Sequence, residues 1–175
     1  MHLNDTIQWF YKADNDYDAA KILNGSYKKH TDIICYLCSQ SAEKYLKGYL
    51  VYKKHQIEKT HNLPYLNYLC IKYDNRFDSI KMDCGLLNKF NSNIRYPDGI
   101  ETDENDVSLS LKTIDKIINS APLLELRNEI IKYQKMNKPS EALSAAEISS
   151  GIKACEYAEI PVSSLVFSQE LLNSC

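Results

Sequence analysis

The stretch CYLCSQSAEKYLKG, from Cys35 to Gly48, carries the clearest helical pattern in the chain. Cys38 and Ala42 stand four residues apart, and further apolar residues recur every three or four positions on either side of them. Such spacing places apolar side chains on one face of an α-helix. The pattern extends in both directions and predicts a helix over residues 31–52, the longest in the chain.

A second stripe on this helix is polar and raises the question of function. Gln40, Glu43, Lys44 and Lys47 lie within about 100° of one another around the helix axis. A glutamate four residues before a lysine is typical of a solvated helix face, where such a pair contributes roughly 0.3 kcal/mol. The same side chains also suit a ligand site. Periodicity alone favours the solvated face.

The remaining sequence predicts further helices and no strands. They are expected over residues 4–25, 63–73, 79–91, 104–118 and 122–133. Pro122 marks either a kink or the start of the last of these helices. The intervening stretch with Pro97 and the Asp98–Gly99 pair is expected to be a loop, because these residues favour turns. The sequence therefore predicts an all-α fold.

Composition divides the chain into two parts. Residues 139–175 contain five acidic residues and one lysine, a local charge of −4, which leaves +2 of the total of −2 for residues 1–138. A chain of 175 residues, 44% of them hydrophobic, can bury a core without disulfides. We therefore expect a helical bundle over residues 1–138 and an acidic C-terminal extension over residues 139–175, partly helical or mobile.

The sequence also indicates in which cellular compartment the protein acts and what its cysteines do. No stretch reaches the roughly 18 apolar residues of a membrane span, so a cytoplasmic protein without membrane contact is expected. Cys35 and Cys38 have the spacing of a zinc-binding pair, but Cys70 and Cys84 form no second close pair. We expect these thiols to pack in the core and to bind no metal.

Two further segments carry groups that suit a phosphate. Arg95 and Tyr96 lie in the predicted loop, where a rigid turn at Pro97 can direct a guanidinium toward phosphate oxygens. His61 precedes a predicted helix start, where free backbone N–H groups favour anions. Together with the lysines of residues 31–52, these groups are candidates for one anion site.

Three motifs in this order resemble the HEPN domain, named for nucleotide-binding proteins of higher eukaryotes and prokaryotes. They are CYLCSQSAEKYLKGYLV, KTHNLPYLNYL and LNKFNSNIRYPDG, and the resemblance covers roughly residues 5–120. It implies an up-and-down bundle of four to five helices, here with a C-terminal helical extension and a weakly structured tail. It also implies a homodimer and a minimal nucleotidyltransferase partner in a toxin–antitoxin or defence system.

One departure from the family pattern concerns catalysis. Ribonucleases of this family carry an arginine and a downstream histidine with four to six residues between them, whereas the corresponding positions after Arg95 hold Ile100, Glu101 and Thr102. A metal-independent ribonuclease with an atypical site would have to use Arg95, His61 and Glu101. The missing histidine makes binding the favoured activity and leaves the enzyme question open.

The sequence thus predicts a module that binds a nucleotide, ATP or GTP, or the phosphates of RNA. The expected nucleotide-binding residues are Gln40, Glu43, Lys44, Lys47, His61, Arg95 and Tyr96. An atypical ribonuclease and a non-catalytic dimeric scaffold remain as alternatives. Trp9 and the tyrosines of residues 31–52 are expected to pack in the core or at an interface.

Overall fold

Helices account for all regular structure in the part of the chain that the structure describes. The computed structural model describes residues 2–28, 30–91, 94 and 100–137. Its elements are α1 (His2–Asn24), α2 (Thr31–Tyr52), α3 (Leu63–Ile71), the 3₁₀ helix η1 (Asn75–Ile80), α4 (Lys81–Asn88), α5 (Glu104–Ile118) and α6 (Ala121–Asn137). The all-α prediction is confirmed, while the predicted extension over residues 139–175 lies outside the described residues. None of the described helices is both long enough and apolar enough to span a lipid bilayer.

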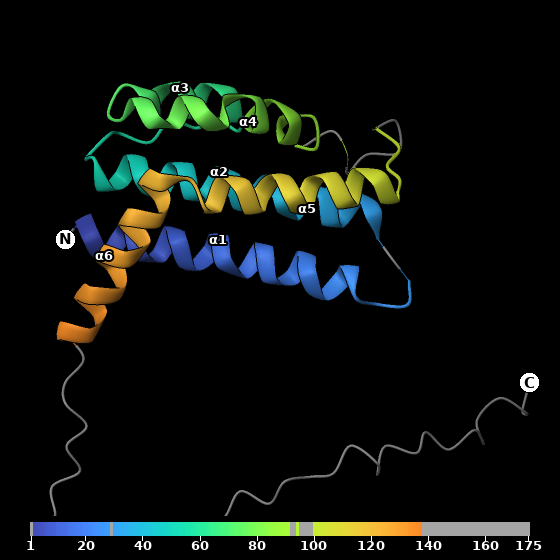
Figure 1. Ribbon diagram of the computed structural model, residues 1–175, viewed down its shortest axis with the longest axis horizontal. Coiled ribbons are helices and arrows are strands. Elements are labelled where there is room, and N and C mark those ends of the chain that lie inside the picture. The colour runs from blue at the N-terminus through green and yellow to red at the C-terminus, as the bar shows by residue number, and fades with distance from the viewer. Residues whose placement is uncertain (1, 29, 92–93, 95–99, 138–175) are drawn as a thin grey trace, which may run out of the picture. The chain divides into compact units, whose positions relative to one another are not determined.

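Helix α2 lies at the centre of the bundle. Figure 1 shows it between α1 on one side and the α3–α4 pair on the other, with α5 running alongside. Its buried side chains therefore point in several directions, and they include the polar residues Ser39, Ser41, Glu43 and Lys47. Periodicity alone favoured a solvated polar face for this helix, but neighbouring helices cover it and bury Glu43 and Lys47.

The pairing of α1 with α2 depends on small residues at the contact. Ser41 donates a hydrogen bond of 2.9 Å from its hydroxyl to the backbone oxygen of Ala13. The Phe10 ring meets the Tyr45 ring edge to face, with 5.1 Å between the ring centres. Gly48 lies directly against Phe10, since a Cβ at this glycine would come within 2.8 Å of the ring. The two helices can approach this closely only because Gly48 has no side chain.

Several helix ends differ from the predicted ones by a few residues, and the largest change is at the helix before Asn88. The helix predicted over residues 79–91 begins earlier, as η1, where the Asp74 side chain accepts a hydrogen bond from the backbone N–H of Arg76. This local cap nucleates a 3₁₀ turn that apolar periodicity does not reveal. At Pro122 the structure resolves the open alternative, because α5 ends at Ile118 and α6 starts as a separate helix at Ala121.

The four cysteines named above and two of the four tyrosines of α2 are buried in the core, as expected. Cys35, Cys38, Cys70 and Cys84 are all buried in the core. Burial raises the pKa of the Cys84 thiol to about 12, so this group stays protonated at neutral pH. Tyr45 and Tyr49 are likewise buried, at 0% and 3% exposure. Their rings are part of the core and are inaccessible to a stacking base.

Candidate functional site

The polar stripe predicted on α2 contains a buried ion pair. The Nζ of Lys47 lies 2.8 Å from Oε1 of Glu43, and the two residues are only 6% and 5% exposed. Trp9 of α1 covers the pair from one side, with its ring centre 5.9 Å from the Nζ of Lys47. Burial of two charges costs desolvation free energy, and this cost is offset only when the two charged groups attract and hydrogen-bond each other.

His61 covers the pair from the other side and is held by it. Its Nδ1 lies 3.1 Å from each carboxylate oxygen of Glu43, although the two residues are 18 positions apart in the chain. Carboxylate oxygens only accept hydrogen bonds, so Nδ1 is the donor and Nε2 of the neutral ring is left as an acceptor. The His61 side chain is 66% exposed. The buried carboxylate thus orients an accessible imidazole.

The backbone around His61 is fixed by neighbouring amides. Asn91 donates a hydrogen bond from its side chain to the backbone oxygen of His61. Gln40 of α2 in turn donates to the side-chain oxygen of Asn91, at 3.3 Å. Asn62 caps α3 by accepting from the backbone N–H of Tyr65 at 2.9 Å. Gln40 therefore belongs to the site by supporting it through Asn91.

An open pocket of about 420 Å³ lies beside His61 at the start of α3. Its lining residues are Lys59, Thr60, His61, Asn62, Asn88, Lys89 and Asn91. The lining contains two lysines and three amides and no carboxylate, although Lys89 also pairs with Asp106 at 2.9 Å. Amide N–H groups and ammonium groups are the donors that bind phosphate oxygens. We call this cavity the His61 pocket.

Lys44 departs from the other members of the predicted stripe. Its Nζ pairs with a carboxylate oxygen of Asp16 on α1. It also lines a different cavity, of about 360 Å³, together with Asp5, Gln8, Trp9 and Lys12. The structure therefore brings Gln40, Glu43, Lys47 and His61 together and places Lys44 on the α1 side of α2.

Three predicted residues lie in or near the loop before α5. Arg95 and Tyr96 lie outside the described residues. Glu101 is exposed. Its neighbour Thr102 donates a hydrogen bond of 2.9 Å to the hydroxyl of Thr31, and the Thr31 hydroxyl donates to the backbone oxygen of Thr102. These bonds tie the start of α2 to the segment that enters α5.

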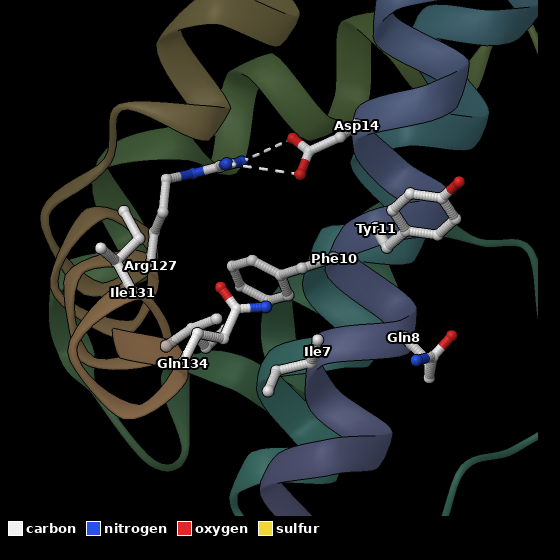
Figure 2. A pocket seen from close by; sticks show the side chains of 9 residues that line it. Ile7, Gln8, Phe10, Tyr11, Asp14, Arg127, Ile131 and Gln134 are labelled. Atoms are coloured by element: carbon white, nitrogen blue, oxygen red, sulfur yellow. Dashed lines mark hydrogen bonds and ion pairs between the residues drawn. The ribbon is translucent and has the colours of Figure 1, made fainter. Parts of the chain in front are cut away.

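The other two arginines of the bundle are occupied by ion pairs. Arg76 binds Asp74 at 2.8 Å and Glu125 at 2.6 Å, and it joins η1 to α6. Figure 2 shows Arg127 of α6 facing Asp14 of α1 across one end of a pocket. The pocket has a volume of about 380 Å³, and Nη2 of Arg127 lies 2.9 Å from Oδ1 of Asp14. With their charges matched, these arginines serve to attach helices.

Tyr45 completes the contact between Arg127 and Asp14. Its hydroxyl donates to Asp14 and accepts from Arg127. Burial, together with the hydrogen bond to Asp14, raises the pKa of the Tyr45 hydroxyl well above its usual range. The hydroxyl therefore keeps its proton at neutral pH, and the network stays closed. This pocket is an apolar groove between α1 and α6 with a neutralised end.

Of the residues that line the His61 pocket, sequence reasoning predicted only His61 and missed both lysines and all three asparagines. Asn88, Lys89 and Asn91 come at and just after the end of α4, and Asn88 accepts from the backbone N–H of Leu63 at 2.9 Å. The signal was present as the polar residues of the run NKFN, which ends three residues before the RYP motif. Nothing local in that run indicates that it packs against the start of α3.

Comparison with known proteins agrees with this architecture. The family model of the HEPN domain matches residues 7–149. The crystal structure of an archaeal HEPN homologue superposes with a TM-score of 0.51 at 22% sequence identity, covering 71% of this chain and 97% of that one. At this identity the likeness bears on the fold alone. No curated protein matches the chain.

Proposed function

The chain belongs to the HEPN domain family, and from this premise we propose that it binds a nucleotide, ATP or GTP, or an RNA strand through phosphates at the His61 pocket. Membership of the family marks the protein as a nucleotide- or RNA-related module. The observation that carries the finer proposal is a pocket with two lysines, three amides and an oriented imidazole, in which no lining residue is acidic.

Each group in the pocket has a role in this proposal. Lys59 and Lys89 supply positive charge, and Asn88 and Asn91 present side-chain amides. His61 gives a phosphate oxygen a hydrogen bond when Nε2 is protonated and accepts one from a ribose hydroxyl when it is not. Glu43 and Lys47 stay beneath the pocket and fix the ring. Arg95 and Tyr96 remain predicted contributors from the neighbouring loop.

Calorimetric titration with ATP and GTP tests this proposal. A Lys59→Ala, His61→Ala double variant is expected to bind at least about tenfold more weakly, because it loses two charge-assisted contacts. Both side chains are exposed, so the fold should be unaffected. His55→Ala is the matched control, since His55 contacts Tyr73 and does not line the pocket. Unchanged affinity in the double variant would remove the pocket from the site.

A ribonuclease is the second candidate, favoured by the contact between His61 and Glu43. In that reaction Nε2 of His61 takes the proton of a ribose 2′-hydroxyl, and the 2′ oxygen bonds to phosphorus. The bond from phosphorus to the 5′ oxygen breaks, and that oxygen takes a proton from water. Cleavage of RNA in the presence of a chelator, lost in His61→Ala and kept in His55→Ala, would support this activity. Its absence in the wild type would exclude it.

Assembly is the remaining part of the proposal. HEPN domains commonly dimerise, and we propose a homodimer that works with a minimal nucleotidyltransferase in a toxin–antitoxin or defence system. Exposed apolar side chains on α6 support a protein partner, namely Leu124 and Ile131 at 41% each and Met136 at 83%.

The buried free thiols support action in the reducing cytoplasm. Light scattering after size exclusion distinguishes the dimer from a monomer, and co-purification with a minimal nucleotidyltransferase tests the partner. A scaffold without a ligand would dimerise but give no heat with ATP.

A further inference from the structure

The cavity that contains Lys44 is built on a stripe of α1. Asp5, Gln8, Trp9 and Lys12 follow one another at the spacing of one helix face, the same spacing as Gln40, Glu43, Lys44 and Lys47 on α2. All four α1 residues line the cavity of about 360 Å³, and Lys44 closes it from α2. We call this cavity the Trp9 hollow.

Trp9 is not part of the core, in contrast to one of the two positions expected for it. Its neighbour Phe10 is buried at 4% exposure, whereas Trp9 is half-buried and forms a wall of the hollow. A single large aromatic ring at the wall of an open cavity is the platform on which nucleic-acid bases stack. The side-chain amide of Gln8 beside it both donates and accepts hydrogen bonds, as the polar edge of a base requires.

The charges around the hollow favour a ring that carries an anionic group. Lys44 is paired with Asp16, but the ammonium of Lys12 has no carboxylate partner among the described residues. Asp5 is the one acidic residue of the lining. A flat heterocycle linked to phosphate fits this combination better than an uncharged aromatic molecule does.

The Trp9 hollow and the His61 pocket border the same stripe of α2. Gln40 reaches Asn91 of the His61 pocket, and Lys44 lines the Trp9 hollow, one helical turn further on. This turn corresponds to about 6 Å along the helix axis. Between the two cavities lies the Glu43–Lys47 pair, which contacts both His61 and Trp9.

We propose that Trp9 is the base-stacking wall of the nucleotide site, so that the base lies in the Trp9 hollow and the phosphates extend toward His61. This inference rests on the proposed function, because it supplies the base subsite for the same ligand. Gln8 reads the edge of the base, and Lys12 contacts the sugar–phosphate link.

Trp9 is the only tryptophan of the chain, so its fluorescence reports directly on the hollow. ATP is expected to quench this fluorescence, whereas inorganic tripolyphosphate, which has no base, is expected to bind without quenching it. In calorimetry, Trp9→Leu should weaken ATP about tenfold and leave tripolyphosphate unchanged. Trp9→Phe should keep most of the affinity, since a planar ring remains. Tyr11→Leu is the matched control, an exposed aromatic of the same helix that does not line the hollow.

The outcomes separate this inference from the proposed function. ATP that binds wild type and Trp9→Leu equally well overturns the base subsite and leaves the His61 pocket standing. No heat with either ATP or tripolyphosphate overturns both. A fluorescence that changes with protein concentration alone, and not with ATP, means that a second copy covers the hollow and also overturns it. If Trp9→Leu loses its helical circular dichroism, Lys12→Gln is used in its place. Lys12 is exposed, so this substitution should weaken the affinity for ATP severalfold without affecting the fold.

Discussion

At the scale of single residues, the Glu43–Lys47 pair has a structural task that precedes any ligand. Both side chains are buried in the middle of α2, between Trp9 and His61. A buried charge without its partner is far more costly than the pair, because it keeps the desolvation penalty and loses the attraction. The pair therefore holds the two covering residues in place only as long as both partners are present.

Lys47→Ala is expected to destabilise the protein by about 3–5 kcal/mol, since it leaves the Glu43 carboxylate buried with only His61 beside it. The double variant Glu43→Leu, Lys47→Met should recover most of this loss, because it replaces both charges by apolar groups of similar volume. Urea denaturation monitored by circular dichroism measures both. Equal destabilisation of the single and double variants would show that the two side chains pack independently.

At the scale of helices, two glycines test how closely the elements approach. A Cβ at Gly48 would lie 2.8 Å from the buried ring of Phe10, whereas a Cβ at Gly85 in α4 would meet nothing within 4 Å. Gly48→Ala should cost about 1–3 kcal/mol through overpacking between α1 and α2. Gly85→Ala should stabilise by about 0.5–1 kcal/mol, since alanine favours the helix. Thermal unfolding of the two variants checks the opposite signs, and a stable Gly48→Ala would contradict the packing described.

The start of α5 makes a prediction about pH. Asp103 accepts hydrogen bonds from the backbone N–H groups of Asp106 and Asn105, and Asp106 accepts from the N–H of Asp103. The bond from the Asp106 backbone is the main cause that lowers the pKa of the Asp103 carboxyl. Because the folded pKa lies below the unfolded one, this stabilisation is present above an ordinary aspartate pKa of about 3.9 and is lost as pH falls through the folded value.

Asp103→Asn keeps a capping side chain but cannot titrate. The wild type should therefore have the higher melting temperature at pH 7, and the difference should shrink toward zero as the pH falls below the ordinary aspartate pKa of about 3.9 and through the lower folded pKa. Melting curves of both proteins across this range measure it. A difference that is the same at both ends of the range would mean that the carboxylate charge contributes nothing to the cap.

The helix boundaries show which parts of the fold can be predicted from local sequence. The helices of residues 31–52 and 104–118 were predicted to within a residue of α2 and α5, because the apolar stripe of each helix is a local signal. Helix α5 also has a local capping box at Asp103, whereas no side chain caps the start of α2. The 3₁₀ helix before α4 was missed, since a hydrogen bond from the Arg76 backbone to Asp74 leaves no periodicity. Boundaries set by side-chain caps inside loops are the part of the fold that pattern reasoning does not reach.

At the scale of the whole molecule, the site depends on contacts between distant segments. The contact of Gln40 with Asn91 joins residues 51 positions apart, and Glu43 meets His61 across 18. The sequence placed Gln40, Glu43 and Lys47 on one stripe correctly, but the packing that buries Glu43 and Lys47 comes from α1 and from the start of α3. The asparagines of the His61 pocket were missed for the same reason. The roles of these residues in binding, and those of Lys44, Arg95 and Tyr96, remain predictions.

The central claim is that His61, oriented by the buried carboxylate of Glu43, contacts the phosphates of a nucleotide. The most direct measurement is a nitrogen-15 spectrum of the imidazoles, recorded while ATP is added to protein labelled at its four histidines. The Nε2 signal of His61 is expected to shift with ATP, while that of His55, held by Tyr73, stays in place. Binding of ATP that leaves the His61 signal unmoved, or no binding at all, would contradict the account.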